Sequence, residues 1–361
     1  MKIGNREFDT LHHTYVVGIL NVTPDSFSDG GKWNTIDNAL YHVERMIDEG
    51  MDIVDIGGES TRPGYVQISD EEEIKRVVPV IEALKARFDV PVSLDTYKSK
   101  VAEAGILAGA DLINDIWGLK YDGTMARVIA KSGLPCCLMH NRSVAGKGDF
   151  GYVDFMQDMA ADLAQTLQIA AKAGISKDKI ILDPGVGFGK SYENNLEVIN
   201  CLEELKVLGC PVLLGCSRKS VIGLTLDLPA DQRVEGTLVT TVFGVIKGCS
   251  FVRVHDVKEN VRAIRMAEAI LGRVEKGFTK TRIPMKNIFA TSPVSRSQAK
   301  QVCNRLEKFK EVVLDFEGIK WMGQGFAHQL FVVFASDHPD IELVPINMNE
   351  DLTKMYRHVT Q

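Results

Sequence analysis

Short apolar runs rich in β-branched residues recur along the first three quarters of the chain, and segments with helical spacing and polar outer faces separate them. Near-continuous apolar runs of this kind are typical of parallel strands that are buried on both faces. Eight such units in about 270 residues predict a (β/α)8 barrel. The expected strands cover residues 15–20, 53–56, 90–94, 112–114, 135–139, 180–182, 212–214 and 251–254.

A doubly wound open sheet is the alternative arrangement of alternating strands and helices. That fold rarely runs to eight such regular units. It also usually places a glycine-rich dinucleotide loop after its first strand, and this chain has no such loop there. The barrel is therefore the favoured fold.

The pattern changes near residue 273, where a basic stretch is interrupted by Gly277 and Pro284. We interpret residues 1–272 as the barrel, residues 273–286 as a linker and residues 287–361 as a small α/β domain. Trp321 and Phe326 are expected in the core of the small domain. Its expected strands are 287–290, 312–316 and 341–346, and its expected helices are 296–308, 325–335 and 349–358.

The net charge and the cysteine content indicate which cellular compartment and which classes of partner to expect for this protein. The net charge of −6 gives no reason to expect a nucleic-acid partner. The seven cysteines are odd in number and lack CxxC spacing, which favours reduced thiols in the cytoplasm. The sequence shows neither a signal-peptide pattern nor an apolar stretch long enough to cross a membrane, so no membrane partner is expected.

Polar residues lie at, or just after, the C-terminal end of every expected strand of the barrel. Each one taken alone is best explained as a turn former or a helix cap. In a (β/α)8 barrel, however, these strand ends converge on one face, and that face carries the active site. The polar strand ends are Asn21, Asp55, Asp95, Asn114, His140, Asp183, the Ser217–Ser220 segment, and Arg253 with His255.

The chemistry of these strand ends suggests two subsites. Asp95, Asn114 and Asp183 are short hydrogen-bond acceptors that suit a flat heterocycle with several N–H donors. The alternative is that loop backbone or a basic neighbour satisfies them. Arg253 and His255 form a cationic corner suited to phosphate, although a carboxylate-paired arginine is the alternative there.

Five motifs of the chain, taken in order, resemble the dihydropteroate synthase family from about residue 14 to residue 272. They are Asn-Val-Thr-Pro-Asp-Ser-Phe-Ser-Asp-Gly-Gly at 21–31, Gly-Gly-Glu-Ser-Thr-Arg-Pro-Gly at 57–64, Asp-Pro-Gly-Val-Gly-Phe-Gly-Lys at 183–190, Ser-Arg-Lys-Ser at 217–220 and Arg-Val-His-Asp-Val at 253–257. The resemblance implies a transferase of folate biosynthesis. Such an enzyme condenses hydroxymethyl-dihydropterin diphosphate with p-aminobenzoate and releases pyrophosphate.

The resemblance also implies a role for each matching residue, with Asp95, Lys219, Arg253 and His255 as the catalytic group. The pterin would contact Asp95, Asn114, Ile116, Met139, Asp183 and Lys219. The diphosphate would contact Asn21, Thr61, Arg62, Arg253 and His255, with Asn21 also touching Mg²⁺. The aminobenzoate would contact Phe27, Thr61, Arg62, Pro63, Phe188, Lys219 and Ser220.

The implied reaction is dissociative: pyrophosphate leaves first, and Asp95 stabilises the resulting pterin methylene cation. A homodimer is implied by the same resemblance. Residues 285–361 are similar to STAS-like domains of uncharacterised role. In STAS relatives that switch by phosphorylation, a Ser stands where this chain has Gly323-Gln324-Gly325-Phe326, which argues against such a switch.

Two other functions remain to be separated from the synthase. A methyltetrahydrofolate methyltransferase would share the acidic pterin pocket, but it has no need for a diphosphate corner or a Ser-Arg-Lys loop. A non-catalytic barrel could serve as a platform for the C-terminal domain, but the diphosphate corner and Lys219 are intact.

Overall fold

The computed structural model of the chain describes residues 1–23, 35–59, 66–143, 151–273, 278–289, 291–304, 306 and 309–360. The chain divides into two compact units, Met1–Arg273 and Val274–Gln361. Each unit has its own hydrophobic core. Four of the predicted site residues lie outside the described residues: Phe27, Thr61, Arg62 and Pro63.

The first unit confirms the predicted (β/α)8 barrel. Eight parallel strands pair in the order β8-β7-β6-β5-β4-β3-β10-β9. A parallel bridge between Leu182 and Val212 joins the two outer strands and closes the sheet. The strands are β3 (Tyr15–Asn21), β4 (Ile53–Gly57), β5 (Val92–Asp95), β6 (Leu112–Asp115), β7 (Cys136–Met139), β8 (Ile180–Asp183), β9 (Leu213–Leu214) and β10 (Phe251–Val254).

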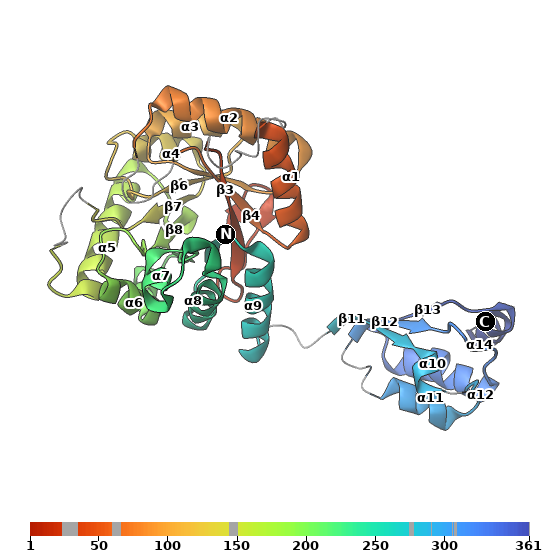
Figure 1. Cartoon of the computed structure of the whole chain (residues 1–361). Helices are drawn as coiled ribbons and strands as arrows, with labels where there is room; N and C mark the ends of the chain where they lie inside the picture. Colours follow the sequence, from red (N-terminus) through yellow and green to blue (C-terminus); the bar gives the residue numbers. More distant parts are fainter. Residues whose placement is uncertain are drawn as a thin grey trace. The chain divides into compact units, whose positions relative to one another are not determined.

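Helices α1 to α9 surround these strands (Figure 1). They are α1 (Thr35–Asp48), α2 (Asp70–Arg87), α3 (Ser99–Ala108), α4 (Met125–Ser132), α5 (Phe155–Ala173), α6 (Tyr192–Asn200), α7 (Ser220–Leu226), α8 (Val234–Lys247) and α9 (Val257–Ile270). Left-handed glycines end several of them, as at Gly109 after α3 and Gly174 after α5. Helix α6 is followed by a 3₁₀ segment, Leu202–Leu208, because Cys201 between them leaves helical geometry.

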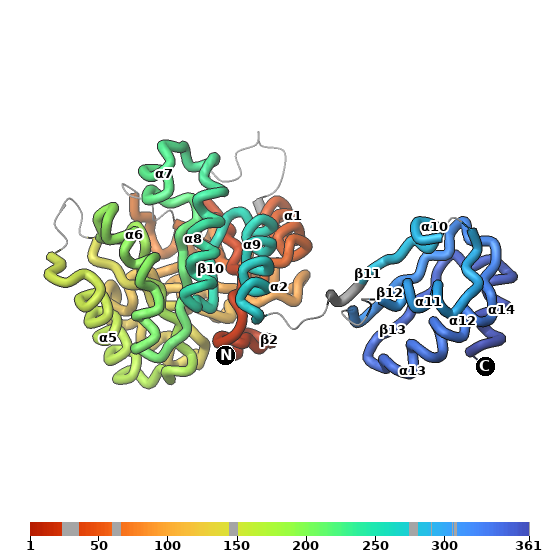
Figure 2. The backbone as a smooth tube through the Cα atoms, turned by 90° about the horizontal axis from the view of Figure 1, so that it is seen from below, coloured from red at the N-terminus to blue at the C-terminus, as the bar shows by residue number. Residues whose placement is uncertain are grey.

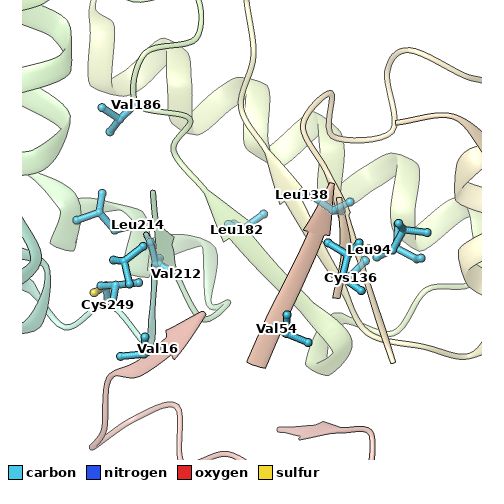
Figure 3. Packing of buried hydrophobic residues seen from close by; sticks show 14 of the residues in the cluster. Val16, Val54, Leu94, Cys136, Leu138, Leu182, Val186, Val212, Leu214 and Cys249 are labelled. Carbon is cyan, nitrogen blue, oxygen red and sulfur yellow. The ribbon is translucent and has the colours of Figure 1, made fainter. Parts of the chain in front are cut away.

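Alternate residues of the strands face outward and inward. Outward-facing side chains such as Val16, Val54, Leu138 and Leu182 belong to the large core that packs between strands and helices (Figure 3). Inward-facing side chains at the N-terminal ends of the strands form a second apolar cluster. The two sets follow from the period of two along a strand.

A short antiparallel hairpin, β1 (Lys2–Ile3) with β2 (Arg6–Glu7), lies at the N-terminal end of the barrel. Ile3 and Phe8 contribute to the inward apolar cluster, together with Phe251. Figure 2 shows β2 and the N-terminus at the end of the barrel opposite to α7. One end of the barrel is therefore closed by apolar side chains.

The second unit is a three-stranded parallel sheet with helices. Its strands, in the order β11-β12-β13, are β11 (Phe278–Pro284), β12 (Phe309–Asp315) and β13 (Glu342–Ile346). Its helices are α10 (Met285–Ile288), α11 (Arg296–Cys303), α12 (Gln324–His328), α13 (Ala335–Asp337) and α14 (Glu350–Thr360), with a π-helical segment, Gln329–Phe334, between α12 and α13. Phe326 is buried in its core as expected, whereas Trp321 is 50% exposed.

The linker predicted over 273–286 is wrong from residue 278 onward, and the strand predicted over 287–290 is wrong as well. Residues 278–284 form the edge strand β11, and helix α10 occupies 285–288. The basic residues Lys280 and Arg282 alternate with Thr281 and Ile283, which is the period of a strand. Charged side chains and a terminal proline are common on edge strands. The basic composition of this segment is therefore that of an edge strand and does not require a linker.

Candidate active site

The polar strand ends predicted from the sequence come together inside the C-terminal half of the barrel. On four strands, an inward-facing apolar side chain is followed, two residues nearer the C-terminal end, by an inward-facing polar one. The pairs are Ile53 and Asp55, Leu112 and Asn114, Ile181 and Asp183, and Phe251 and Arg253. Strand register places Asn21, Gly57 and Asp95 side by side, and Asp95 opposite Asn114. The strand pairing itself therefore assembles the site.

Arg253 is held between two carboxylates in the centre of this end. Its Nε donates to Asp55 Oδ2 at 2.6 Å, and its Nη2 donates to Asp95 Oδ2 at 2.8 Å. Asp55 is fully buried and also accepts from Ser93 Oγ and Asn114 Nδ2. The carboxylate-paired arginine that the sequence left as an alternative is thus present in this structure.

The two carboxylates and the guanidinium influence one another electrostatically. Burial raises the pKa of Asp95 to about 7, and the positive charge of Arg253 opposes that rise. Burial lowers the pKa of Arg253, but Asp55 and Asp95 more than offset this and hold it above its usual range. Arg253 is therefore charged at every physiological pH, while the charge on Asp95 depends on pH near neutrality.

Asp183 and Lys219 are two opposite charges of the site that attract each other. Asp183 Oδ1 accepts from the Gly185 N–H at 2.7 Å, while Lys219 Nζ donates to the Val186 carbonyl at 2.6 Å and lies 4.8 Å from the centre of the Phe188 ring. Burial raises the pKa of Asp183 and lowers that of Lys219, and the attraction between the two charges opposes both shifts. A ligand that donates to Asp183 and accepts from Lys219 would therefore stabilise the charged form of each side chain.

Glycine is required in the loop that joins β8 to α6. Gly185 and Gly189 both have positive φ. A β-carbon on Gly185 would lie 2.0 Å from the His140 carbonyl oxygen, and one on Gly189 would lie 2.4 Å from the Arg142 carbonyl carbon. The motif thus allows this loop to pack directly on the chain that follows β7.

An apolar wall adjoins these polar groups. Ile116 and Met139 are buried in a cluster with Tyr97, and Trp117 and Phe188 pack against it while partly exposed. Ile116 follows β6 and Met139 ends β7. The cluster provides apolar side chains of the kind that contact the faces of a heterocyclic ring.

The remaining predicted residues lie at the rim. His255 contacts Ser217 Oγ through Nδ1 at 3.0 Å, and Arg218 beside it pairs with Asp256. Ser220, at the start of α7, is exposed. Asn21 ends β3, and its side chain accepts or donates no hydrogen bond within the described ranges.

Three residues of the site were not assigned a role from the sequence. Asp55 and His140 were noted only as polar strand ends, and Lys190 only as the last letter of a motif. Asp55 could have been found from its inward position two residues after Ile53. Lys190 and His140 contact each other, Nζ to Nδ1, at 2.9 Å, beside the glycine loop.

Comparison with known proteins agrees with this geometry. Residues 17–255 match the family described as pterin binding enzyme, and residues 298–353 match a family described as a STAS-like domain of unknown function. A dihydropteroate synthase from Clostridium beijerinckii is 60% identical over 274 residues, which cover 76% of this chain and 100% of that protein.

Two solved structures show the same likeness. A Yersinia pestis dihydropteroate synthase with a sulfonamide drug complex is 44% identical with a TM-score of 0.70, over 76% of this chain and 99% of that one. The Xanthomonas albilineans enzyme in complex with 7,8-dihydropteroate is 39% identical with a TM-score of 0.66, over 72% of this chain and 94% of that one. On the family match, the identities and the shared barrel, this chain belongs to the dihydropteroate synthase family of transferases.

Proposed function

We propose that the C-terminal end of the barrel joins hydroxymethyl-dihydropterin diphosphate to p-aminobenzoate, giving dihydropteroate and pyrophosphate. One observation carries this proposal: Asp95, Asn114 and Asp183 converge as acceptors in the same barrel end as the cations Lys219 and Arg253. A pterin offers N–H donors to the acceptors, and a diphosphate offers negative charge to the cations. The structure of the Xanthomonas albilineans relative with 7,8-dihydropteroate supports the assignment.

The pterin edge would bond to the acceptors Asp95, Asn114 and Asp183, and Lys219 would donate to the ring. Asp183 is suited to this because Gly185 uses its Oδ1, which leaves Oδ2 for a ligand. A donor-rich ring also removes the cost of keeping buried acceptors without donors. The ring faces would lie against the apolar wall that contains Ile116 and Met139.

The diphosphate would bind at Arg253, His255 and Asn21. Arg253 uses Nε and Nη2 for its two carboxylates, and its Nη1 has no partner among the residues that the structure describes. That nitrogen can donate to a phosphate oxygen without breaking either ion pair. Arginine N–H groups suit phosphate oxygens in charge and geometry.

At the diphosphate site, a magnesium ion would be coordinated jointly by the protein and the substrate. Within the described ranges, no group of three or more His, Cys, Asp or Glu side chains is placed to hold a metal. Mg²⁺ commonly keeps several waters and binds through substrate phosphates plus one or two protein oxygens. The amide oxygen of Asn21 would supply such an oxygen, and the bound ion would offset negative charge on the leaving pyrophosphate.

The reaction would proceed by loss of the leaving group before addition of the amine. The bond between the methylene carbon and the diphosphate oxygen breaks, and pyrophosphate departs with the electron pair. Asp95, in its ionised form, would stabilise the positive charge that spreads over the pterin. The amine of p-aminobenzoate then adds its lone pair to the methylene carbon and loses a proton.

The aminobenzoate would occupy the rim beside Phe188, Lys219 and Ser220. Phe188 presents a ring face within reach of the Lys219 ammonium, so an aromatic acid could contact both. The predicted contributions of Phe27, Thr61, Arg62 and Pro63 fall on residues that the structure does not describe, and they remain part of the proposal.

A single-turnover assay with both substrates and Mg²⁺ tests this function directly. We expect equal amounts of pyrophosphate and dihydropteroate. A methyltransferase would release neither, and a non-catalytic platform would bind the pterin without turnover. The metal assignment has its own measurement: calorimetry should show weak Mg²⁺ binding to the ligand-free protein, and tight stoichiometric binding there would contradict it.

We also propose a homodimer that forms through α8 and α9. Five large apolar side chains are exposed on these two adjacent helices, Val239, Phe243 and Ile246 on α8 and Met266 and Ile270 on α9. Those on α8 follow helical spacing along one stripe, which is typical of a covered face. Sedimentation equilibrium should give twice the chain mass, and Phe243→Asp should shift it toward the monomer.

The cytoplasm is the proposed compartment. All seven cysteines are free, and six of them are buried. Burial raises the pKa of the Cys216 thiol to about 12 and that of Cys249 to about 12, so these thiols are unreactive. No helix among the described residues combines the length and apolarity needed to cross a bilayer.

A further inference from the structure

Lys190 is a buried cation that the proposed reaction does not use. It lies at the end of the loop between β8 and α6 and is 7% exposed. Its ammonium contacts three acceptors: the Gly185 carbonyl at 2.8 Å, the Phe188 carbonyl at 2.9 Å and His140 Nδ1 at 2.9 Å. An ammonium has three N–H donors, so each has a partner, and only such matching makes a buried charge tolerable.

His140 extends this contact to the neighbouring helix. Because its Nδ1 accepts from Lys190, its Nε2 carries the proton and donates to Asp162 Oδ2 at 3.0 Å. Burial lowers the pKa of His140 to about 4, with Asp162 opposing, so the ring is neutral and able to accept. Arg142 donates to the same Asp162 oxygen at 2.6 Å. The network therefore joins the end of β7, the glycine loop and α5.

The loop segment that Lys190 holds provides most of the contacts to the charged pair in the pocket. The Gly185 N–H bonds to Asp183, the Val186 carbonyl accepts from Lys219, and the Phe188 ring lies against the Lys219 ammonium. The two carbonyls bonded to Lys190 flank Val186 on either side. Moving that segment would move the partners of Asp183 and Lys219 together.

We propose that Lys190 is a positioning residue for the ligand pocket: its ammonium fixes residues 185–188 so that Asp183, Lys219 and Phe188 are held in place for the pterin and the aminobenzoate. It acts through the loop and touches no ligand itself. This inference rests on the proposed function, because that function assigns the pterin and aminobenzoate to these three side chains. Fixing them before binding avoids the cost of ordering them during binding.

The charge of Lys190 is sensitive to pH near neutrality. Burial lowers its pKa to about 7; Asp183 and Asp162 oppose that shift, while Lys219 and Arg142 add to it. His140 faces it directly, and Tyr152, which bonds to the Gly189 carbonyl, lies beside His140. Above its pKa, the amine has two N–H donors for three acceptors, so one contact is lost. The hold on the loop should therefore weaken as pH rises past about 7.

The test compares Lys190→Met with Lys179→Met at pH 6.5. Lys179 also donates to a backbone carbonyl, that of Gly133, but at the opposite end of β8, so it is a matched control. We expect Lys190→Met to raise the KM for p-aminobenzoate about tenfold with a change in kcat below about threefold, because positioning affects binding more than the chemical step. Lys179→Met should change neither.

A pH comparison separates positioning from general packing. Between pH 6.5 and 8.5, the KM of the wild type should rise more than that of Lys190→Met, because both proteins carry Lys219, Asp183 and Asp95 and only one carries Lys190. Parallel KM curves would overturn the proposal. So would an unchanged KM in folded Lys190→Met, or a loss confined to kcat.

His140→Phe is a second variant in case Lys190→Met does not fold. It removes one of the three acceptors, and we expect a smaller rise in the same KM; an unchanged KM would reject the inference. The wild-type assay keeps this apart from the proposed function. A wild type without turnover refutes the synthase proposal. An active wild type whose variants have an unchanged KM for p-aminobenzoate refutes only the role of Lys190.

Discussion

The two ends of the barrel interior differ in kind although the same strands build both. At the N-terminal end, inward side chains such as Ile53, Ile181 and Phe251 form an apolar cluster with the β1–β2 hairpin. Two residues further along, the same strands present Asp55, Asp183 and Arg253. Two residues along each strand thus separate a packed apolar core from a charged pocket.

This difference implies a division of labour between stability and binding. The apolar end gains stability from burial of large side chains. At the polar end, burial shifts the pKa values of Asp95 and Asp183 upward and that of Lys219 downward, so the ionised forms are disfavoured without a ligand. Residues that cost stability and are retained are typical of functional sites.

The largest expected effect is at the apolar end. Phe251→Ala should lower the free energy of unfolding by about 3–5 kcal/mol, because it leaves a cavity in a fully buried cluster. Turnover per folded molecule should stay close to that of the wild type. Denaturant unfolding measures the first and active-site titration the second. Leu107→Ala, at an 85% exposed position on α3, is the control and should change stability by less than about 0.5 kcal/mol.

The next effect concerns binding at the polar end. Asp183→Ala should weaken pterin binding by roughly 2–4 kcal/mol, the scale of losing a charged hydrogen-bond partner. The loss of thermal stability should be smaller than in Phe251→Ala, because the cost of burying a carboxylate disappears together with its hydrogen bond from Gly185 and its attraction to Lys219. Calorimetry with a pterin ligand measures the affinity. Equal affinity in the variant, or a loss of stability as large as that of Phe251→Ala, would contradict the division between the two ends.

The third effect should appear as a pH dependence of stability. The pKa of Asp95 is about 7 when folded against an ordinary value of 3.8, so the folded state binds more protons between these values. Stability contributed by this group therefore falls as pH rises from about 4 to about 7. The wild type should lose unfolding free energy relative to Asp95→Asn over this range, whereas the exposed Glu103→Gln should run parallel to the wild type. Parallel curves for all three would reject the shift.

Whether the sequence could predict a feature of this site depends on how far apart in the chain the contacting residues are. The strand ends were accessible because Asp95, Asn114 and Asp183 each follow an apolar run. The bond between Arg253 and Asp55 joins residues 198 positions apart, and only closure of the barrel brings them together. No local pattern in the sequence encodes that distance, so the pairing of Arg253 stayed open until the structure was known.

The role of Lys190 and the position of β11 were missed for different physical reasons. Lys190 is a charged residue at the end of a glycine-rich loop, and nothing in its neighbours along the chain shows that its ammonium is buried against three acceptors. In β11, the basic composition that includes Lys280 and Arg282 is typical of a linker, whereas their alternation with Thr281 and Ile283 is typical of a strand. Edge strands carry such charges, so periodicity was the better guide.

The smallest expected effect comes from removing the second unit altogether. A chain ending at Arg273 should fold and retain its KM values and kcat within about twofold, because both ends of the barrel are built from residues 1–273 and each unit has a separate core. The Clostridium beijerinckii relative supports this expectation, since its whole length is matched over 274 residues. Steady-state kinetics and thermal unfolding of the truncated and full chains provide the measurement. A truncated barrel that unfolds at the same temperature but loses most of its turnover would show that the second unit serves the polar end, and the two-ended description of the barrel would then be incomplete.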